Sequence, residues 1–149
     1  MKISREKPEK WLNGRQMMEI EAKPSVAEMY SIGYHLYQAG RYADAEGCFR
    51  LLTTLDTQNA HHWIGLGAAL QKQNKYCEAV DAYGAAALFE DTEGNPYPHL
   101  HAAECLFAVG DLSRAEKALA SARKISSKKS RYTALVKRID VMKECWSSV

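Results

Sequence analysis

The chain has 149 residues, 46% of them hydrophobic and 26% charged, a composition that is ordinary for one globular domain. Its formal net charge of +2 is too small to indicate nucleic acid or an acidic membrane as a partner. No apolar run is long enough to span a membrane, and the charged start has no apolar stretch behind it, so we expect neither a membrane helix nor a secretory signal.

Residues 1–25 form an N-terminal arm ahead of a repeated pattern. After a charged start, the arm contains a short apolar stripe made of Trp11, Leu12, Met17, Met18 and Ile20. We expect one amphipathic helix from about Glu9 to Ala22. This helix would either cover the open end of the repeats or form a self-association surface, and the sequence leaves both alternatives open.

Three copies of one pattern occupy residues 26–129. The segment VAEMYSIGYHLYQAGRYADAEGCFRLL (26–52) is echoed 34 residues later by AHHWIGLGAALQKQNKYCEAVDAYGAA (60–86). A third copy begins at Pro96, after a loop with extra residues, so the repeats span 26–59, 60–95 and 96–129. A period of 34 with the pattern W-x2-L-G-x2-Y and A-x3-F is typical of the tetratricopeptide repeat. The sequence therefore predicts an all-α fold, a tetratricopeptide-repeat superhelix with three helix-turn-helix repeats.

Small residues, and residues that tolerate a left-handed backbone conformation, fall where such a repeat needs them. We expect the paired helices at 26–38 and 42–55, 60–72 and 75–89, and 96–109 and 112–125. Ser25 and Glu28 have the spacing of a capping box at the first of them. The turns within the pairs contain residues that tolerate a left-handed conformation, namely Gly40, Asn74 and Gly110. Close helix crossings are expected where small residues face one another, Gly33 against Ala45 and Gly67 against Ala79.

The C-terminal segment, 130–149, is expected to contain a capping helix at about 131–146 and a short tail. One face of that helix is apolar and consists of Tyr132, Leu135, Val136, Ile139 and Met142. Such a stripe is typical of a helix that packs against the last repeat of a solenoid.

The sequence contains no recognisable constellation for catalysis or metal binding. Adjacent histidines at 61–62, and histidines two apart at 99 and 101, cannot share a helical face. We therefore expect no enzymatic activity, no metal and no cofactor. Glu104 lies among apolar residues of a helix, and we interpret it as a polar contact to a partner's backbone or to a neighbouring lysine. The cysteines are interpreted as small buried or half-buried side chains in a reducing cytoplasm: Cys48, Cys77, Cys105 and Cys145.

In a tetratricopeptide superhelix the first helix of each repeat lines a concave groove, chiefly through its second, fifth, ninth and twelfth positions. The predicted peptide-binding groove consists of Tyr30, Tyr34, Tyr37, His61, Ile64, Ala68, Gln71, Tyr97, Leu100, Glu104 and Phe107. The three tyrosines form one stripe and are expected to be surplus to packing, since the core of their helix is supplied by Met29, Ile32, Gly33 and Leu36. Tyrosine is enriched at binding hot spots. The alternative is that the N-terminal helix covers these rings.

Three phrases resemble a known family. GYHLYQAGRYADAEGCF (33–49), WIGLGAALQ (63–71) and HAAECLF (101–107) are similar to the three repeats of the bacterial type III secretion chaperones for translocator proteins, the LcrH/SycD class. A weaker similarity lies in WLNGRQMMEI (11–20). The resemblance implies that Tyr30, Tyr34 and Tyr37 match the family's groove aromatics, and that the chain forms a homodimer through its N-terminal region.

The same resemblance implies a function. We expect a cytoplasmic bacterial chaperone that binds an extended, proline- and leucine-containing segment of a secreted translocator, or of a similar effector, and keeps it soluble and secretion-competent. The lysine and asparagine clamp that some tetratricopeptide domains use for a terminal carboxylate is missing. The alternative is a general tetratricopeptide scaffold in a stable protein complex, and release of the bound protein separates the two.

Overall fold

The structure is a computed structural model and describes residues 23–90 and 94–149. This part of the chain is all-α, as predicted. Its elements are α2 (Val26–Gln38), α3 (Tyr42–Leu55), α4 (Ala60–Lys72), α5 (Tyr76–Phe89), α6 (Pro96–Ala108), α7 (Leu112–Ser126), the short 3-10 helix η1 (Ser130–Tyr132) and α8 (Thr133–Ser147). The helix expected between Glu9 and Ala22, and the dimer contact expected of it, lie outside the described residues.

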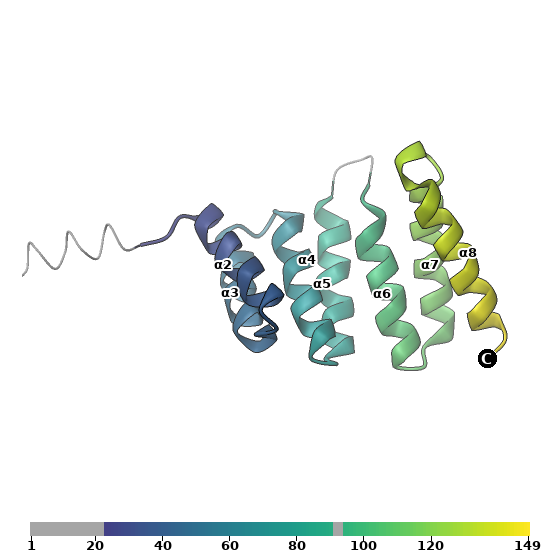
Figure 1. The fold of residues 1–149 in the computed structure, drawn as a ribbon, viewed down its shortest axis with the longest axis horizontal. Helices are drawn as coiled ribbons and strands as arrows, with labels where there is room; N and C mark the ends of the chain where they lie inside the picture. The colour runs from purple at the N-terminus through teal and green to yellow at the C-terminus, as the bar shows by residue number, and fades with distance from the viewer. Residues whose placement is uncertain (1–22, 91–93) are drawn as a thin grey trace, which may run out of the picture.

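The helices form three antiparallel pairs, α2/α3, α4/α5 and α6/α7, which stack side by side in chain order, with α8 at the C-terminal end (Figure 1). This arrangement confirms the predicted superhelix with its C-terminal capping helix. Most helix bounds agree with expectation to within a residue. The exception is the last helix, where residues 130–132 form a 3-10 turn before α8 begins at Thr133.

The predicted helix ends are confirmed. The hydroxyl of Ser25 accepts a hydrogen bond from the backbone N–H of Glu28, whose carboxylate accepts one from the backbone N–H of Ser25, both at 3.2 Å. Gly40, Asn74 and Gly110 have φ angles of 78°, 60° and 83°, so each reverses the chain between the two helices of a repeat. Left-handed backbone at these three equivalent positions sets the same turn in all three repeats.

The close helix crossings involve aromatic rings, which the prediction of small residues facing one another did not include. A Cβ on Gly33 would lie 3.0 Å from Cζ of Phe49, and one on Gly67 would lie 2.7 Å from Cε1 of Tyr83. The glycines therefore make room for rings that are almost completely buried, and Gly33 also lies close to Sγ of Cys48 on the facing helix, 3.3 Å from the position of an added Cβ. Gly65 makes room for the Phe49 ring as well, because an added Cβ would overlap that ring.

Two other packing predictions were wrong. Ile32, expected in the core, is 47% exposed, because it lies on the side of α2 that no described helix covers. Of the four cysteines, only Cys105 is buried and Cys48 is half-buried, whereas Cys77 and Cys145 are exposed. The position of Ile32 and of the cysteines within their helices therefore did not decide by itself which of them are buried.

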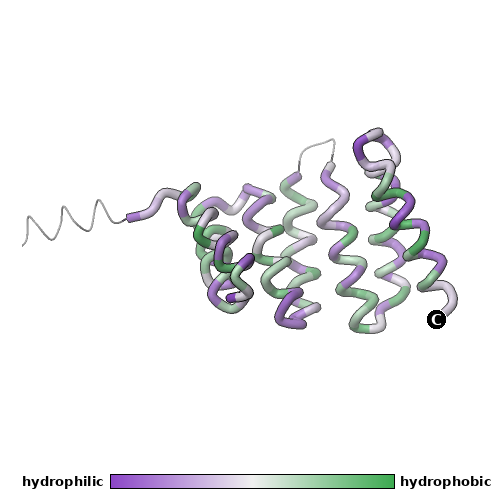
Figure 2. The backbone as a smooth tube through the Cα atoms, in the orientation of Figure 1, coloured by the Kyte–Doolittle hydropathy of each residue, from purple (hydrophilic) through white to green (hydrophobic). Residues whose placement is uncertain are grey.

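Hydrophobic packing at the C-terminal end follows the predicted stripe. Leu135 and Ile139 of α8 are buried and form one cluster with Leu100, Leu119 and neighbouring alanines. Figure 2 shows hydrophobic and hydrophilic residues alternating in bands along α8, as expected of a helix with one buried face.

A polar cluster around Glu46 ties the first repeat to the second. Glu46 of α3 accepts hydrogen bonds from Arg50 of the same helix, from Gln73 at the end of α4 and from Lys75 before α5, each at 2.9 Å. Partial burial raises the pKa of the Glu46 carboxyl, but these three donors outweigh it and lower the pKa from 4.5 to about 2. The ionised carboxylate is therefore stabilised in the folded chain.

We expect Glu46→Gln to lower the free energy of unfolding by about 1 kcal/mol at pH 7, since charge-assisted hydrogen bonds are lost from a site where both cations are half-exposed. The folded pKa is depressed, so this stabilisation is complete above about pH 4.5 and is lost as the pH falls toward 2. Urea unfolding at several pH values checks this. Asp44→Asn is the matched control, because its ion pair with Arg41 is exposed on both sides. A difference from wild type that stayed constant down to pH 3 would contradict the assignment.

Candidate peptide-binding groove

A hollow of about 410 Å³ opens between the first helices of the three repeats. Tyr37 of α2 forms one wall, and Gln71 of α4 lies opposite His101 and Glu104 of α6. Of the predicted groove residues, the structure brings four together here, namely Tyr37, Ala68, Gln71 and Glu104. The hollow is therefore the central part of the predicted groove.

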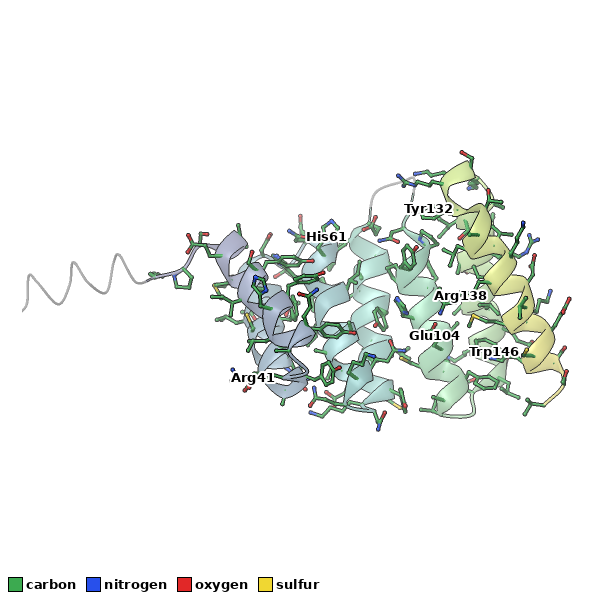
Figure 3. The ribbon with its side chains drawn as sticks, viewed as in Figure 1. Arg41, His61, Glu104, Tyr132, Arg138 and Trp146 are labelled. Carbon is green, nitrogen blue, oxygen red and sulfur yellow. The ribbon has the colours of Figure 1, made fainter. Side chains whose placement is uncertain are left out.

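A chain of hydrogen bonds forms the floor of the hollow. The Tyr83 hydroxyl donates to Oε1 of Gln71 at 2.8 Å, and Nε2 of Gln71 donates to Oε2 of Glu104 at 3.1 Å. Nδ1 of His101 lies 3.0 Å from the same carboxylate oxygen. Arg138 of α8 approaches the other oxygen to 3.4 Å, and Figure 3 shows Glu104 and Arg138 facing each other across α6 and α8. The network fixes the side chains that a bound segment would meet.

Glu104 is held in its ionised form. Burial raises the pKa of its carboxyl, but the hydrogen bonds from His101 and Gln71 and the charge of Arg138 outweigh burial and lower the pKa. Among the described residues the polar partners of Glu104 are thus His101, Gln71 and Arg138, and of the two predicted alternatives the neighbouring lysine is not found. The carboxylate orients donors on three helices and supplies fixed negative charge to the groove.

The three tyrosines of α2 do not share one environment. Tyr34 is 48% exposed, and its hydroxyl oxygen accepts a hydrogen bond from Gln38 at 3.0 Å. Tyr30 and Tyr37 are half-buried and pack against the central core, with the Tyr30 ring 5.8 Å from the ring of Phe49. The prediction that all three are surplus to packing was therefore wrong for Tyr30 and Tyr37, and only Tyr34 is free of the core.

The second repeat presents its predicted residues along α4. His61 is exposed at the start of the helix (Figure 3), whereas Ile64 is half-buried and packs against the core. Ala68 is half-buried and lines the hollow. A small side chain at this point leaves the space above the polar floor open.

The third repeat departs most from expectation. Leu100 is completely buried among Ala103, Leu119 and other apolar residues, so it cannot line a surface groove, and its predicted place was wrong. Tyr97 is 40% exposed, with its ring 6.1 Å from that of His101. Phe107 is half-buried, and its ring stacks on Trp146 of α8 with centroids 4.5 Å apart. One face of Phe107 is therefore already occupied.

Sequence reasoning missed the contribution of residues outside the first helices. Tyr83 of α5 stands where the first repeat has Phe49, and its extra hydroxyl was a signal that this core position reaches a polar surface. Tyr132 of η1 contacts Tyr97, with ring centroids 6.2 Å apart. Arg138 and Tyr132 come from the C-terminal segment, and no spacing rule within the repeats indicates that they reach the groove.

The fold defines a tetratricopeptide-repeat protein with a groove between the first helices of its repeats. Two family models, both described as Tetratricopeptide repeat, match residues 26–59 and 70–139. None of the described helices combines the length and hydropathy needed to cross a membrane.

Similar proteins narrow this class. Low calcium response locus protein H of Yersinia pestis is 32% identical over 128 residues, which cover 86% of this chain and 75% of that protein. The Yersinia enterocolitica type III secretion chaperone SycD, solved in complex with a peptide of the translocator YopD, is 33% identical with a TM-score of 0.76, covering 81% of this chain and 91% of that chain. Pseudomonas aeruginosa PcrH, solved with the chaperone binding region of PopD, is 35% identical with a TM-score of 0.77. The match covers 82% of this chain and 90% of that chain. The chain belongs to this family of type III secretion translocator chaperones.

Proposed function

We propose that this protein binds an extended segment of a hydrophobic secreted translocator, or of a similar effector, in the groove around the hollow between α2, α4 and α6. The observation that carries the proposal is a polar floor with exposed tyrosines one helical turn away, Tyr34 before Tyr37 on α2 and Tyr97 before His101 on α6. Tyr34 and Tyr97 offer apolar faces for proline and leucine side chains, while Gln71, His101 and Glu104 lie where the backbone of an extended segment needs hydrogen-bonding partners. Two relatives were solved with translocator segments, which supports the same ligand class here.

The mechanism needs binding alone. Translocators carry apolar segments that would aggregate or insert prematurely in the cytoplasm of the producing bacterium. Binding stabilises the soluble state by mass action, by about 2.7 kcal/mol when the free chaperone is at one hundred times the dissociation constant. Because the contacts are non-covalent and the floor is partly polar, the secretion machinery can withdraw the bound segment. A scaffold in a stable complex would retain its partner, so release distinguishes the alternative function.

Site-specific photo-crosslinking in the native bacterium tests the proposal. A photoreactive phenylalanine analogue at position 34 is expected to crosslink a secreted protein with predicted membrane-spanning helices. The same analogue at position 88 is the control, since Leu88 of α5 is 77% exposed and lies outside the groove residues. Crosslinks to non-secreted proteins from position 34, or the same secreted protein captured equally from position 88, would favour the scaffold or another binding face.

A further inference from the structure

The two ends of the chain differ sharply in charge. Residues 112–149 contain 10 of the 20 lysines and arginines but only three of the 18 aspartates and glutamates, which gives this segment a net charge of +7. The remaining residues, 1–111, contain 10 basic and 15 acidic side chains, a net charge of −5. The overall value of +2 therefore conceals a strongly basic C-terminal end formed by α7, η1 and α8.

This basic end contains a cavity of about 620 Å³ along the seam between α7 and α8. Its floor is apolar and includes Leu119, Ile139 and Trp146. Its basic rim includes Lys117, Lys124 and Lys143. We call this cavity the α7–α8 groove.

The basic side chains that line the groove outnumber the carboxylates near them. Within the described residues, no ion pair joins Lys117, Lys124 or Lys143 to an acidic side chain. Glu116 is the one carboxylate among the lining residues, and Asp140, which borders the seam, is already paired with Arg123 at 2.6 Å. Asp140 also interacts electrostatically with Lys143, but the basic side chains lining the cavity outnumber the carboxylates, so the groove combines an apolar floor with an excess of positive charge.

A second cavity of about 500 Å³ shares Arg123 and Ser127 with the α7–α8 groove and continues it toward η1. Lys128, Ser130 and Lys137 line this extension. Because α7 and α8 each have 15 residues, the seam is about 22 Å long. A helix of about four turns matches that length.

The α7–α8 groove is separate from the concave groove, since the two cavities have no lining residue in common. Helix α8 is held in place on its other side by contacts with α6, namely the Phe107–Trp146 stack and the Arg138–Glu104 pair. Figure 3 shows Arg138 and Trp146 along α8, at the end of the superhelix. Both grooves are thus open at the same time in one molecule.

We propose that the α7–α8 groove is a docking site for an acidic amphipathic helix of a second protein partner, distinct from the segment bound in the concave groove. The apolar floor requires aliphatic or aromatic side chains, and the lysine rim requires carboxylates beside them. A nucleic acid supplies negative charge but no aliphatic side chains for the floor. An anionic bilayer is flat and cannot enter a recessed seam, since membrane binding requires apolar side chains that project.

Fluorescence anisotropy with a designed probe tests this proposal on the full chain. The probe is a labelled 14-residue peptide of leucine and glutamate, with leucines at helical i, i+3, i+4 and i+7 spacing. Wild type is expected to bind it, and the variant Lys124→Glu/Lys143→Glu to bind at least about tenfold more weakly, because two attractive pairs become repulsive. Lys23→Glu/Arg41→Glu has the same net charge, lies outside the groove and is expected to bind as wild type. Circular dichroism verifies that all variants are folded.

Three further measurements decide between explanations. A scrambled peptide of the same composition is expected to bind more weakly, and equal binding would reduce the effect to charge alone and overturn the proposal. A single-stranded oligonucleotide or phosphatidylglycerol vesicles could instead bind more tightly than the probe and lose affinity in the Lys124→Glu/Lys143→Glu variant. That result would assign the groove to another class of partner. If the probe peptide does not bind to wild type at millimolar concentration, the proposal is also overturned. Tyr34→Ala is expected to bind the probe normally, so failure here is distinguishable from failure of the proposed function.

Discussion

Tyr34→Ala is expected to weaken binding of the translocator segment by about thirtyfold or more, because truncation of a buried tyrosine anchor in an interface costs about 2 kcal/mol or more. The ring is 48% exposed in the free chain and makes one side-chain hydrogen bond, to Gln38. Its removal therefore costs the fold little, whereas Tyr30 and Tyr37 also support the core. Tyr34 is thus the position of α2 where loss of binding is separable from loss of structure.

The dissociation constant of the segment identified by crosslinking, measured by isothermal titration calorimetry, checks this result. Leu88→Ala is the control, since it removes a large exposed apolar side chain that lies outside the groove. Both variants are expected to retain the helical circular dichroism of wild type. Unchanged affinity of the Tyr34→Ala variant would mean that the segment binds elsewhere.

Gly67→Ala is expected to lower the free energy of unfolding by about 2 kcal/mol, although alanine is the better helix former. The added Cβ would lie 2.7 to 2.9 Å from three atoms of the Tyr83 ring. That ring is 1% exposed, and its hydroxyl is held by Gln71 at 2.8 Å, so it has no space into which to move. Overpacking of about 3 kcal/mol then exceeds the gain of about 1 kcal/mol in helix propensity.

Gly84→Ala is the control for that experiment. Gly84 is also inside a helix, but no atom lies within 4 Å of its added Cβ, so only the propensity gain remains. We expect this variant to be more stable than wild type by about 0.5–1 kcal/mol. Urea unfolding followed at 222 nm measures both changes. Equal effects of the two substitutions would show that the Gly67–Tyr83 contact does not limit packing.

The local features of the fold were predictable because they depend on near neighbours in the chain. The Ser25–Glu28 capping box and the left-handed turn residues Gly40, Asn74 and Gly110 follow from backbone chemistry within a few residues. The 34-residue period extended that reasoning, since repeated units pack on one another in the same way. The all-α class and the helix bounds within the three repeats were therefore correct to within a residue.

The candidate site was predictable only in its middle. Tyr37, Ala68, Gln71 and Glu104 lie together because the repeat register holds best where one repeat contacts the next. Leu100 was misplaced because α8, which is not a full repeat, completes a core cluster there. A register rule describes internal repeats, but the residues at the ends of a stack have different neighbours.

The sequence by itself determined the period, the turns, the helix ends and the family to which this chain belongs, because each depends on residue types at fixed spacing. Only the tertiary structure decided which side of each helix is covered, that Arg138 reaches Glu104, and that basic side chains of α7 and α8 border one apolar seam. Burial and electrostatics depend on distances between residues far apart in the chain, and a net charge of +2 carries no information about where the charges lie.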